Sequence, residues 1–135
     1  MDDAAALRAK IPGYADYADL DARRETDKRV RAYLGEALSE ARERLTPSAA
    51  LADRLDGLLL RCEFSDQRFV RAADHARFAG LLADRVHQLD RELIDCADRI
   101  RGAESPDELS ALLDDAARAL DERFGVVADA RAGSV

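Results

Sequence analysis

Apolar residues recur along most of the chain at intervals of three and four, which is the spacing of one face of an α-helix. β-Branched residues are scarce, and no run alternates apolar and polar positions as a half-buried strand would. The pattern therefore predicts an all-helical chain. The two clearest stripes are Leu51, Leu55, Leu58/Leu59 and Cys62, and Leu82, Val86, Leu89, Leu93, Cys96 and Ile100.

Proline, glycine and serine divide this pattern into five helices. Pro12-Gly13 ends a short first helix, Thr46-Pro47-Ser48 separates two long ones, and Gly102 ends another. Ser105-Pro106-Asp107-Glu108 combines an N-cap serine, a proline at the first helical position and the glutamate of a capping box. We predict helices over about residues 3–10, 17–45, 49–62, 74–101 and 106–124, with the tail frayed.

Residues 63–73 are ambiguous, because a helix could continue through them or break there. In a continuous straight helix Phe69, Val70 and Ala73 would point away from the face that the later stripe defines, so we predict a loop or a short helix. Gly57 costs up to about 1 kcal/mol inside a helix and predicts a close approach to a neighbouring element. Together the elements favour one domain over residues 1–135, an antiparallel four-helix bundle with a short extra N-terminal helix.

The charge balance narrows the classes of partner. The chain has 36% charged residues, as slender bundles often do, and a net charge of −7, which argues against a general nucleic-acid binder. No apolar run approaches the ~20 residues that cross a bilayer, and no basic–apolar leader opens the chain. We therefore expect a cytoplasmic protein with no transmembrane segment.

A charged stretch, RRETDKRVR at residues 23–31, interrupts the apolar face of the first long helix. Arg23 and Asp27 fall on that face four residues apart, where they can pair with each other. Three interpretations stay open: a solvated helix end, an Arg23–Asp27 pair partly buried against a tyrosine segment, or a cationic surface formed by Arg24, Lys28 and Arg31. The candidate partner-binding residues are Tyr14, Tyr17, Arg23, Arg24, Asp27, Lys28 and Arg31.

Residues that could carry chemistry are few and scattered. His75 and His87 lie twelve positions apart on one predicted helix, so their side chains diverge by about 120° and cannot share a metal ion. We expect His75 on the apolar seam and His87 exposed outside it. Cys62 and Cys96 lie on apolar stripes, which predicts buried free thiols with raised pKa, although a bridge would form if their helices met in register.

Neither a nucleophile motif of the Gly-x-Ser-x-Gly type nor a glycine-rich phosphate loop is present in the sequence. We therefore predict no enzymatic activity, no metal and no cofactor.

Three short motifs near the start resemble the opening of a group of uncharacterised bacterial all-helical proteins. These motifs are Ile11-Pro12-Gly13-Tyr14 with Tyr17, Arg23-Arg24, and Asp27-Lys28, which fit IPGY-x-x-Y followed by RR-x-x-DK. Residues 112–124 are similar to the last helix of that group, whereas residues 62–66 depart from its central Tyr/Gly/Phe-rich turn. The resemblance covers about half the chain and implies a bacterial origin and a helical architecture, but it implies no activity.

The leading hypothesis from the sequence is a non-enzymatic helical interaction or adaptor module that binds a protein partner or a second copy of itself. A peripheral adaptor at an anionic membrane surface is the first alternative. A metal-dependent enzyme is the second.

Overall fold

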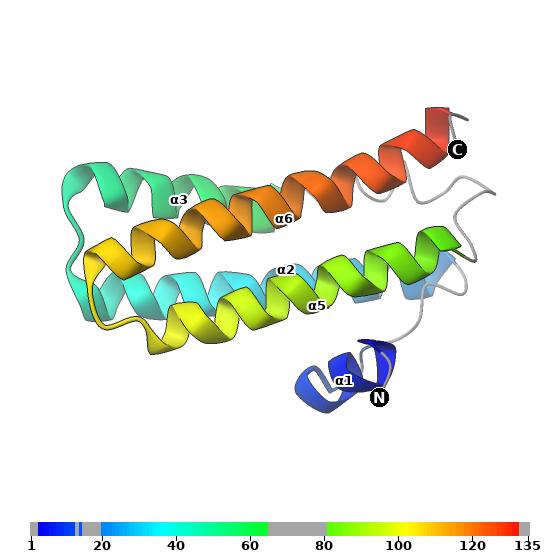
Figure 1. Ribbon diagram of the computed structural model, residues 1–135, viewed down its shortest axis with the longest axis horizontal. Coiled ribbons are helices and arrows are strands. Elements are labelled where there is room, and N and C mark those ends of the chain that lie inside the picture. Colours follow the sequence, from blue (N-terminus) through cyan, green and yellow to red (C-terminus); the bar gives the residue numbers. More distant parts are fainter. Residues whose placement is uncertain (1–2, 13, 15–19, 65–80, 133–135) are drawn as a thin grey trace.

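The computed structural model describes residues 3–12, 14, 20–64 and 81–132, and over these residues the chain is helical and contains no strand (Figure 1). The elements are α1 (Asp3–Lys10), α2 (Leu20–Leu45), α3 (Ala49–Phe64), α5 (Leu81–Gly102) and α6 (Pro106–Ala132). The prediction of an all-helical chain is confirmed. None of the described helices is both long enough and apolar enough to cross a bilayer.

The helix ends follow the capping residues. Ser48 Oγ accepts a hydrogen bond from the Leu51 amide at 3.3 Å, and Ser105 Oγ accepts one from the Glu108 amide at 3.2 Å. Glu108 in turn accepts from the Glu104 amide at 2.7 Å, one residue earlier than an ideal capping box. Thr46 follows α2 with a φ of 46°, the left-handed conformation that commonly ends a helix.

Two boundaries differ from the sequence prediction, and two regions with predicted boundaries are not described, one of which holds the predicted start of the first long helix at residues 17–19. Helix α3 continues two residues further, to Phe64, and α6 continues through Gly125 to Ala132 instead of ending near residue 124. A single glycine weakens a helix but does not stop it. The predicted loop beyond residue 64 and the predicted helix start at 74–80 lie outside the described residues.

The four long helices form two antiparallel hairpins. Arg42 on α2 pairs with Asp56 on α3 at 2.9 Å, and Cys96 Sγ on α5 donates a hydrogen bond to the Leu112 carbonyl on α6 at 3.3 Å. Both hairpin turns lie at the same end of the molecule (Figure 1). The predicted antiparallel arrangement therefore holds within each hairpin.

Between the hairpins, neighbouring helices run in the same direction. Helix α2 packs on α5. Arg123 bonds both Asp27 of α2 and Asp90 of α5, and further along Tyr33 of α2 bonds Asp98 of α5, so residue numbers rise in the same direction on the two helices. Helix α3 packs more lightly on α6, where Arg61 pairs with Asp121 at 2.6 Å. Only a short link forces consecutive helices to be antiparallel neighbours, and α3 and α5 are separated by 16 residues in the sequence, between the end at Phe64 and the start at Leu81.

The core is built from the apolar stripes that the sequence predicts. Residues on the inward faces of all four long helices are buried, and the transfer of each leucine from water contributes about 1.5–3 kcal/mol. Gly57 is a correction, because it is exposed and a β-carbon at this position would meet no other atom within 4 Å. Gly35 lies nearer to a neighbouring helix, since a β-carbon there would be in ordinary van der Waals contact with Cys62 Cβ at 3.7 Å.

Helix α1 and the residues after it cover a second face of α5. Leu7, Ile11 and Tyr14 are buried, and Lys10 Nζ pairs with Asp98 at 2.7 Å. Partial burial of Asp98 opposes ionisation, but hydrogen bonds from Lys10 and Tyr33 outweigh it and hold the pKa of Asp98 below its ordinary value. The N-terminal helix is thus part of the folded unit.

Candidate functional site

A buried polar network lies where the start of α2, the start of α5 and the end of α6 meet. Its members have side chains exposed by 6% or less, a rare situation for ionisable residues. Among the described residues the buried polar and charged side chains are Thr26, Asp27, Arg31, His87, Asp90 and Arg123, and the Tyr14 ring is buried beside them.

Arg123 is the centre of this network. Its Nε donates to Asp90 Oδ1 at 2.6 Å, and its Nη1 donates to Asp27 Oδ1 at 2.6 Å. Arg31 Nε donates to the other oxygen of Asp27 at 3.0 Å, and Arg31 also donates to the main-chain carbonyl of Cys62 on α3. Two guanidinium groups therefore neutralise two carboxylates and link four helices.

Tyr14 connects the N-terminal segment to the same carboxylates. Its hydroxyl donates to Asp90 Oδ2 at 2.9 Å and lies 2.6 Å from His87 Nδ1. The contact with the tyrosine oxygen orients the His87 ring toward Tyr14.

The structure places the predicted partner-binding residues in different environments. Tyr14, Asp27 and Arg31 belong to the buried network, and Lys28 is exposed. Arg31 is therefore not part of an exposed cationic surface, and Asp27 lies in the core, paired with Arg31 and Arg123, instead of in a solvated helix end. The side chains of Arg23 and Arg24, and the whole of Tyr17, lie outside the described residues.

The expectation that His87 is exposed was wrong. His87, Asp90, Ile94 and Ala97 form a second stripe on α5, displaced from the leucine stripe, and this stripe is buried. The helical projection assumed that α5 has one buried face, whereas α1 covers another. His75 lies outside the described residues.

A signal for the network was present in the sequence. Asp27 stands three residues before Val30, and Arg123 three residues after Leu120, so each continues the apolar stripe of its helix. Opposite charges at stripe positions on two helices favour a buried pair, but sequence spacing alone does not show that these two helix ends meet.

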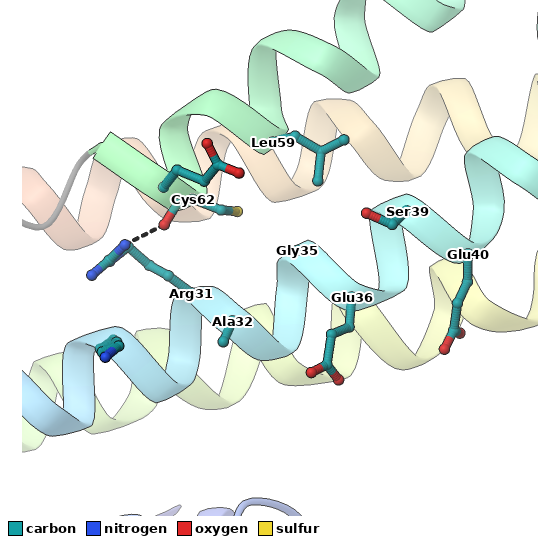
Figure 2. A pocket seen from close by; sticks show the side chains of 10 residues that line it. Arg31, Ala32, Gly35, Glu36, Ser39, Glu40, Leu59 and Cys62 are labelled. Atoms are coloured by element: carbon teal, nitrogen blue, oxygen red, sulfur yellow. Dashed lines mark hydrogen bonds between the residues drawn. The ribbon is translucent and has the colours of Figure 1, made fainter.

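Beside the network, α2 and α3 enclose a groove of about 630 Å³. Small residues of α2 line one wall, and Leu59 and Cys62 of α3 line the other (Figure 2). Arg31 reaches its end, where the bond to the Cys62 carbonyl joins the two walls (Figure 2). The residues around the groove are Lys28, Arg31, Ala32, Gly35, Glu36, Ser39, Glu40, Leu59, Cys62 and Glu63.

The rim of this groove is charged, whereas the walls formed by Ala32, Gly35, Leu59 and Cys62 are not. The side chains of Glu36 and Glu40 point away from α3 (Figure 2). Both pair with Arg101 of α5, Glu36 Oε2 lying 3.6 Å from Nη2 and Glu40 Oε2 lying 3.3 Å from Nε. Glu63 and Lys28 are exposed. A second cavity, of about 320 Å³ between α5 and α6, is lined mainly by charged side chains and so offers little apolar surface to a ligand.

Both cysteines are buried free thiols, as predicted. Burial raises the pKa of Cys62 to about 11 and that of Cys96 to about 11, so both are neutral near pH 7. Cys62 therefore contributes an apolar surface to the groove and not a nucleophile. No cluster of three potential metal ligands occurs within the part of the chain that the structure describes.

Comparisons with protein-family models, with characterised proteins and with solved structures found no match to this chain. Function is therefore inferred from the groove and the network themselves.

Proposed function

We propose that the chain is a non-enzymatic interaction module, a four-helix bundle with α1 as an extra helix, that binds a protein partner in the groove between α2 and α3. The groove is the observation that supports this proposal, because mostly apolar walls with a charged rim are the usual composition of a protein-binding surface. Its volume of about 630 Å³ is large enough to take several side chains of a partner.

Two contacts between α2 and α3 hold the walls of the groove in place, which favours binding of a partner without a large rearrangement. Arg31 connects α2 to the Cys62 carbonyl of α3, and Arg42 connects α2 to Asp56 further along the same hairpin. Arg31 is in turn held by Asp27 in the core. Walls that are already fixed lose little conformational entropy when a partner binds.

The burial and bonding of the polar residues favour an interaction role over catalysis. The groups with useful chemistry, His87, Asp90 and Arg123, are bonded within the network and are exposed by 6% or less. The thiol that faces the groove, Cys62, has a raised pKa. These observations support a structural role for the ionisable groups and a recognition role for the surface beside them.

Site-specific photo-cross-linking in the native host cell tests this function. Ala32, exposed in the groove, and Ala111, exposed on α6 away from it, are each replaced by benzoylphenylalanine. We expect one adduct of defined mass from position 32 and none from position 111. An identical adduct pattern at both positions, or no adduct at position 32, would contradict the proposal, and an adduct of twice the chain mass would identify a second copy as the partner.

A further inference from the structure

Helix α1 lies outside the four long helices and covers one face of α5 (Figure 1). The Ile11 amide donates to the Leu7 carbonyl at 2.8 Å and so continues the helix, and the Tyr14 amide donates to the Ile11 carbonyl at 2.9 Å and closes a turn. We call α1 together with Ile11, Pro12 and Tyr14 the α1 strap.

Two ion pairs align the α1 strap with α5. Asp3 pairs with Arg91 at 3.3 Å, and Lys10 pairs with Asp98 at 2.7 Å. Asp3 and Lys10 are seven positions apart, as are Arg91 and Asp98, so the two helices run side by side in the same direction for about two turns.

The other anchors of the α1 strap are apolar. Its Leu7, Ile11 and Tyr14 side chains are buried, and on α5 the buried Ile94 and Ala97 lie between the positions of the two ion pairs. Three anchors are few beside the core that the four long helices share. Detachment of the strap therefore returns much less apolar surface to water than unfolding of the bundle does.

The carboxylates that the α1 strap bonds each keep a second partner inside the bundle. Asp90 accepts one hydrogen bond from the strap and another, on its other oxygen, from Arg123 at 2.6 Å. Asp98 likewise accepts one from the strap and another, on its other oxygen, from the Tyr33 hydroxyl at 2.5 Å. A buried carboxylate is most costly when it loses all its partners, and detachment of the strap does not cause this at either position.

The arginines that bond the α1 strap already reach water. Arg91, the partner of Asp3, has a side chain that is 44% exposed. Arg29 donates to the Pro12 carbonyl at 3.0 Å and is 40% exposed. Contacts of this kind contribute little to stability, because water readily replaces them. The strap can therefore leave α5 while the four long helices remain folded.

The α1 strap also shows what the uncovered face of α5 fits. Leu7 and Ile11 are four positions apart on one helical face, and Tyr14 supplies a hydroxyl to Asp90. A helix from another protein can replace the strap if it presents two aliphatic side chains at this spacing, followed by a tyrosine.

We propose that the α1 strap is a detachable autoinhibitory element. It occupies a docking face of α5 that, once the strap has left, binds a helix of a partner protein with the same anchors. This face shares no residue with the groove between α2 and α3 and does not depend on it.

Hydrogen exchange of the full chain in dilute urea tests whether the strap detaches. The protection of α1 amides should be at least about a hundredfold lower than that of the α5 core and nearly independent of urea, because a small opening exposes little surface. Tyr14→Phe removes the bond to Asp90 and should lower α1 protection about tenfold. Arg8→Ala, at an exposed position of α1, should leave it within about twofold.

Fluorescence anisotropy tests the docking face with a labelled peptide that has the sequence of residues 3–14. Leu7→Ala in the full chain weakens the strap and leaves α5 unchanged, so the apparent affinity should rise at least about tenfold as the open fraction rises. Tyr14→Phe in the chain should raise it too. Arg8→Ala, and Ala32→Trp in the other groove, should leave it within about twofold. A peptide with alanine in place of leucine, isoleucine and tyrosine should not bind.

Three results would overturn the proposal. One is exchange of α1 amides only together with the bundle. Another is equal peptide affinity of the natural, Leu7→Ala and Tyr14→Phe chains, or peptide binding that Ala32→Trp abolishes. The third is a dimer of the natural chain in light scattering, which would place the strap of a second copy on α5 in place of a partner helix. Saturating peptide should remove the protection of the chain's own α1 amides, and unchanged protection would also contradict displacement.

Discussion

Replacement of Arg123 by methionine is the most direct test of the buried network. The Arg123 side chain is 4% exposed and donates to Asp27 and to Asp90, at 2.6 Å in each case, and both carboxylates are 0% exposed. Methionine keeps much of the apolar stem but removes the charge and both hydrogen bonds. Asp27 retains Arg31, whereas Asp90 retains the Tyr14 hydroxyl but loses the cation beside it.

The expected cost follows from the burial of these partners. Removal of one member of a buried ion pair lowers the free energy of unfolding by about 3–5 kcal/mol, since the remaining buried charge loses a cation that compensated its desolvation. A domain of this size is stable by about 5–15 kcal/mol in total, so the variant should unfold at a markedly lower urea concentration. Helical circular dichroism during urea titration measures this directly, and the chain has no tryptophan to serve as an alternative probe.

Two further variants make the result specific. Arg54→Met removes an arginine whose pair with Asp114 is exposed, at 41% and 74% for the two side chains, and should cost less than about 1 kcal/mol. Combining Arg123→Met with Asp90→Asn should recover part of the loss, because a neutral amide needs no cation yet still accepts the Tyr14 hydroxyl proton. If Arg123→Met cost no more than Arg54→Met, the reasoning about the network would be refuted.

Three other predictions concern single features of the fold. Gly57→Ala should raise the free energy of unfolding, measured by urea titration, by about 0.5–1 kcal/mol. Alanine is a better helix former than glycine, and this exposed helical position has open space for a β-carbon. A loss of stability would contradict this. Cys62 and Cys96 should react with iodoacetamide at pH 8 at least about a hundredfold more slowly in the native chain than in urea, and the rate should rise as the pH approaches their pKa of about 11. Asp98 has a pKa below its ordinary value, so its stabilising bond to Lys10 is fully present above the ordinary pKa and is lost as the pH falls through the folded value. The protection of α1 amides, measured as the exchange rate relative to the intrinsic rate at each pH, should therefore fall below about pH 4, and Asp98→Asn should remove that dependence.

Local signals in the sequence predicted the helices and most of the core. The capping serine before α6 and the break at Thr46 placed two helix ends, and the leucine spacing identified the faces that are buried. These features depend on residues within one or two turns of each other, and their physical causes act at that range. The burial of both cysteines followed from the same spacing.

The features that could not be predicted depend on which elements meet. Asp27 and Arg123 are 96 positions apart in the sequence, and their contact requires α2 to lie beside the end of α6. His87 is buried because α1 and Tyr14 cover it, which no periodicity within α5 reveals. The groove likewise depends on which faces of α2 and α3 meet, and the close approach that the sequence had predicted at Gly57 is absent, because Gly57 is exposed.

The network also explains how two hairpins with repetitive cores adopt one register. A leucine stripe with spacings of three and four nearly repeats after seven residues, so sliding α2 along α5 by two turns would exchange one set of apolar contacts for a similar one. The same shift would separate Asp27 from Arg123, which is the ion pair that joins the two hairpins, while the Asp27–Arg31 and Asp90–Arg123 pairs lie within single hairpins and would remain. Arg31 belongs to this network and also joins α2 to the Cys62 carbonyl at the end of the groove. The Asp27 carboxylate that pairs with Arg123 across the hairpins therefore also holds Arg31, whose bond to the Cys62 carbonyl joins the two walls of the groove.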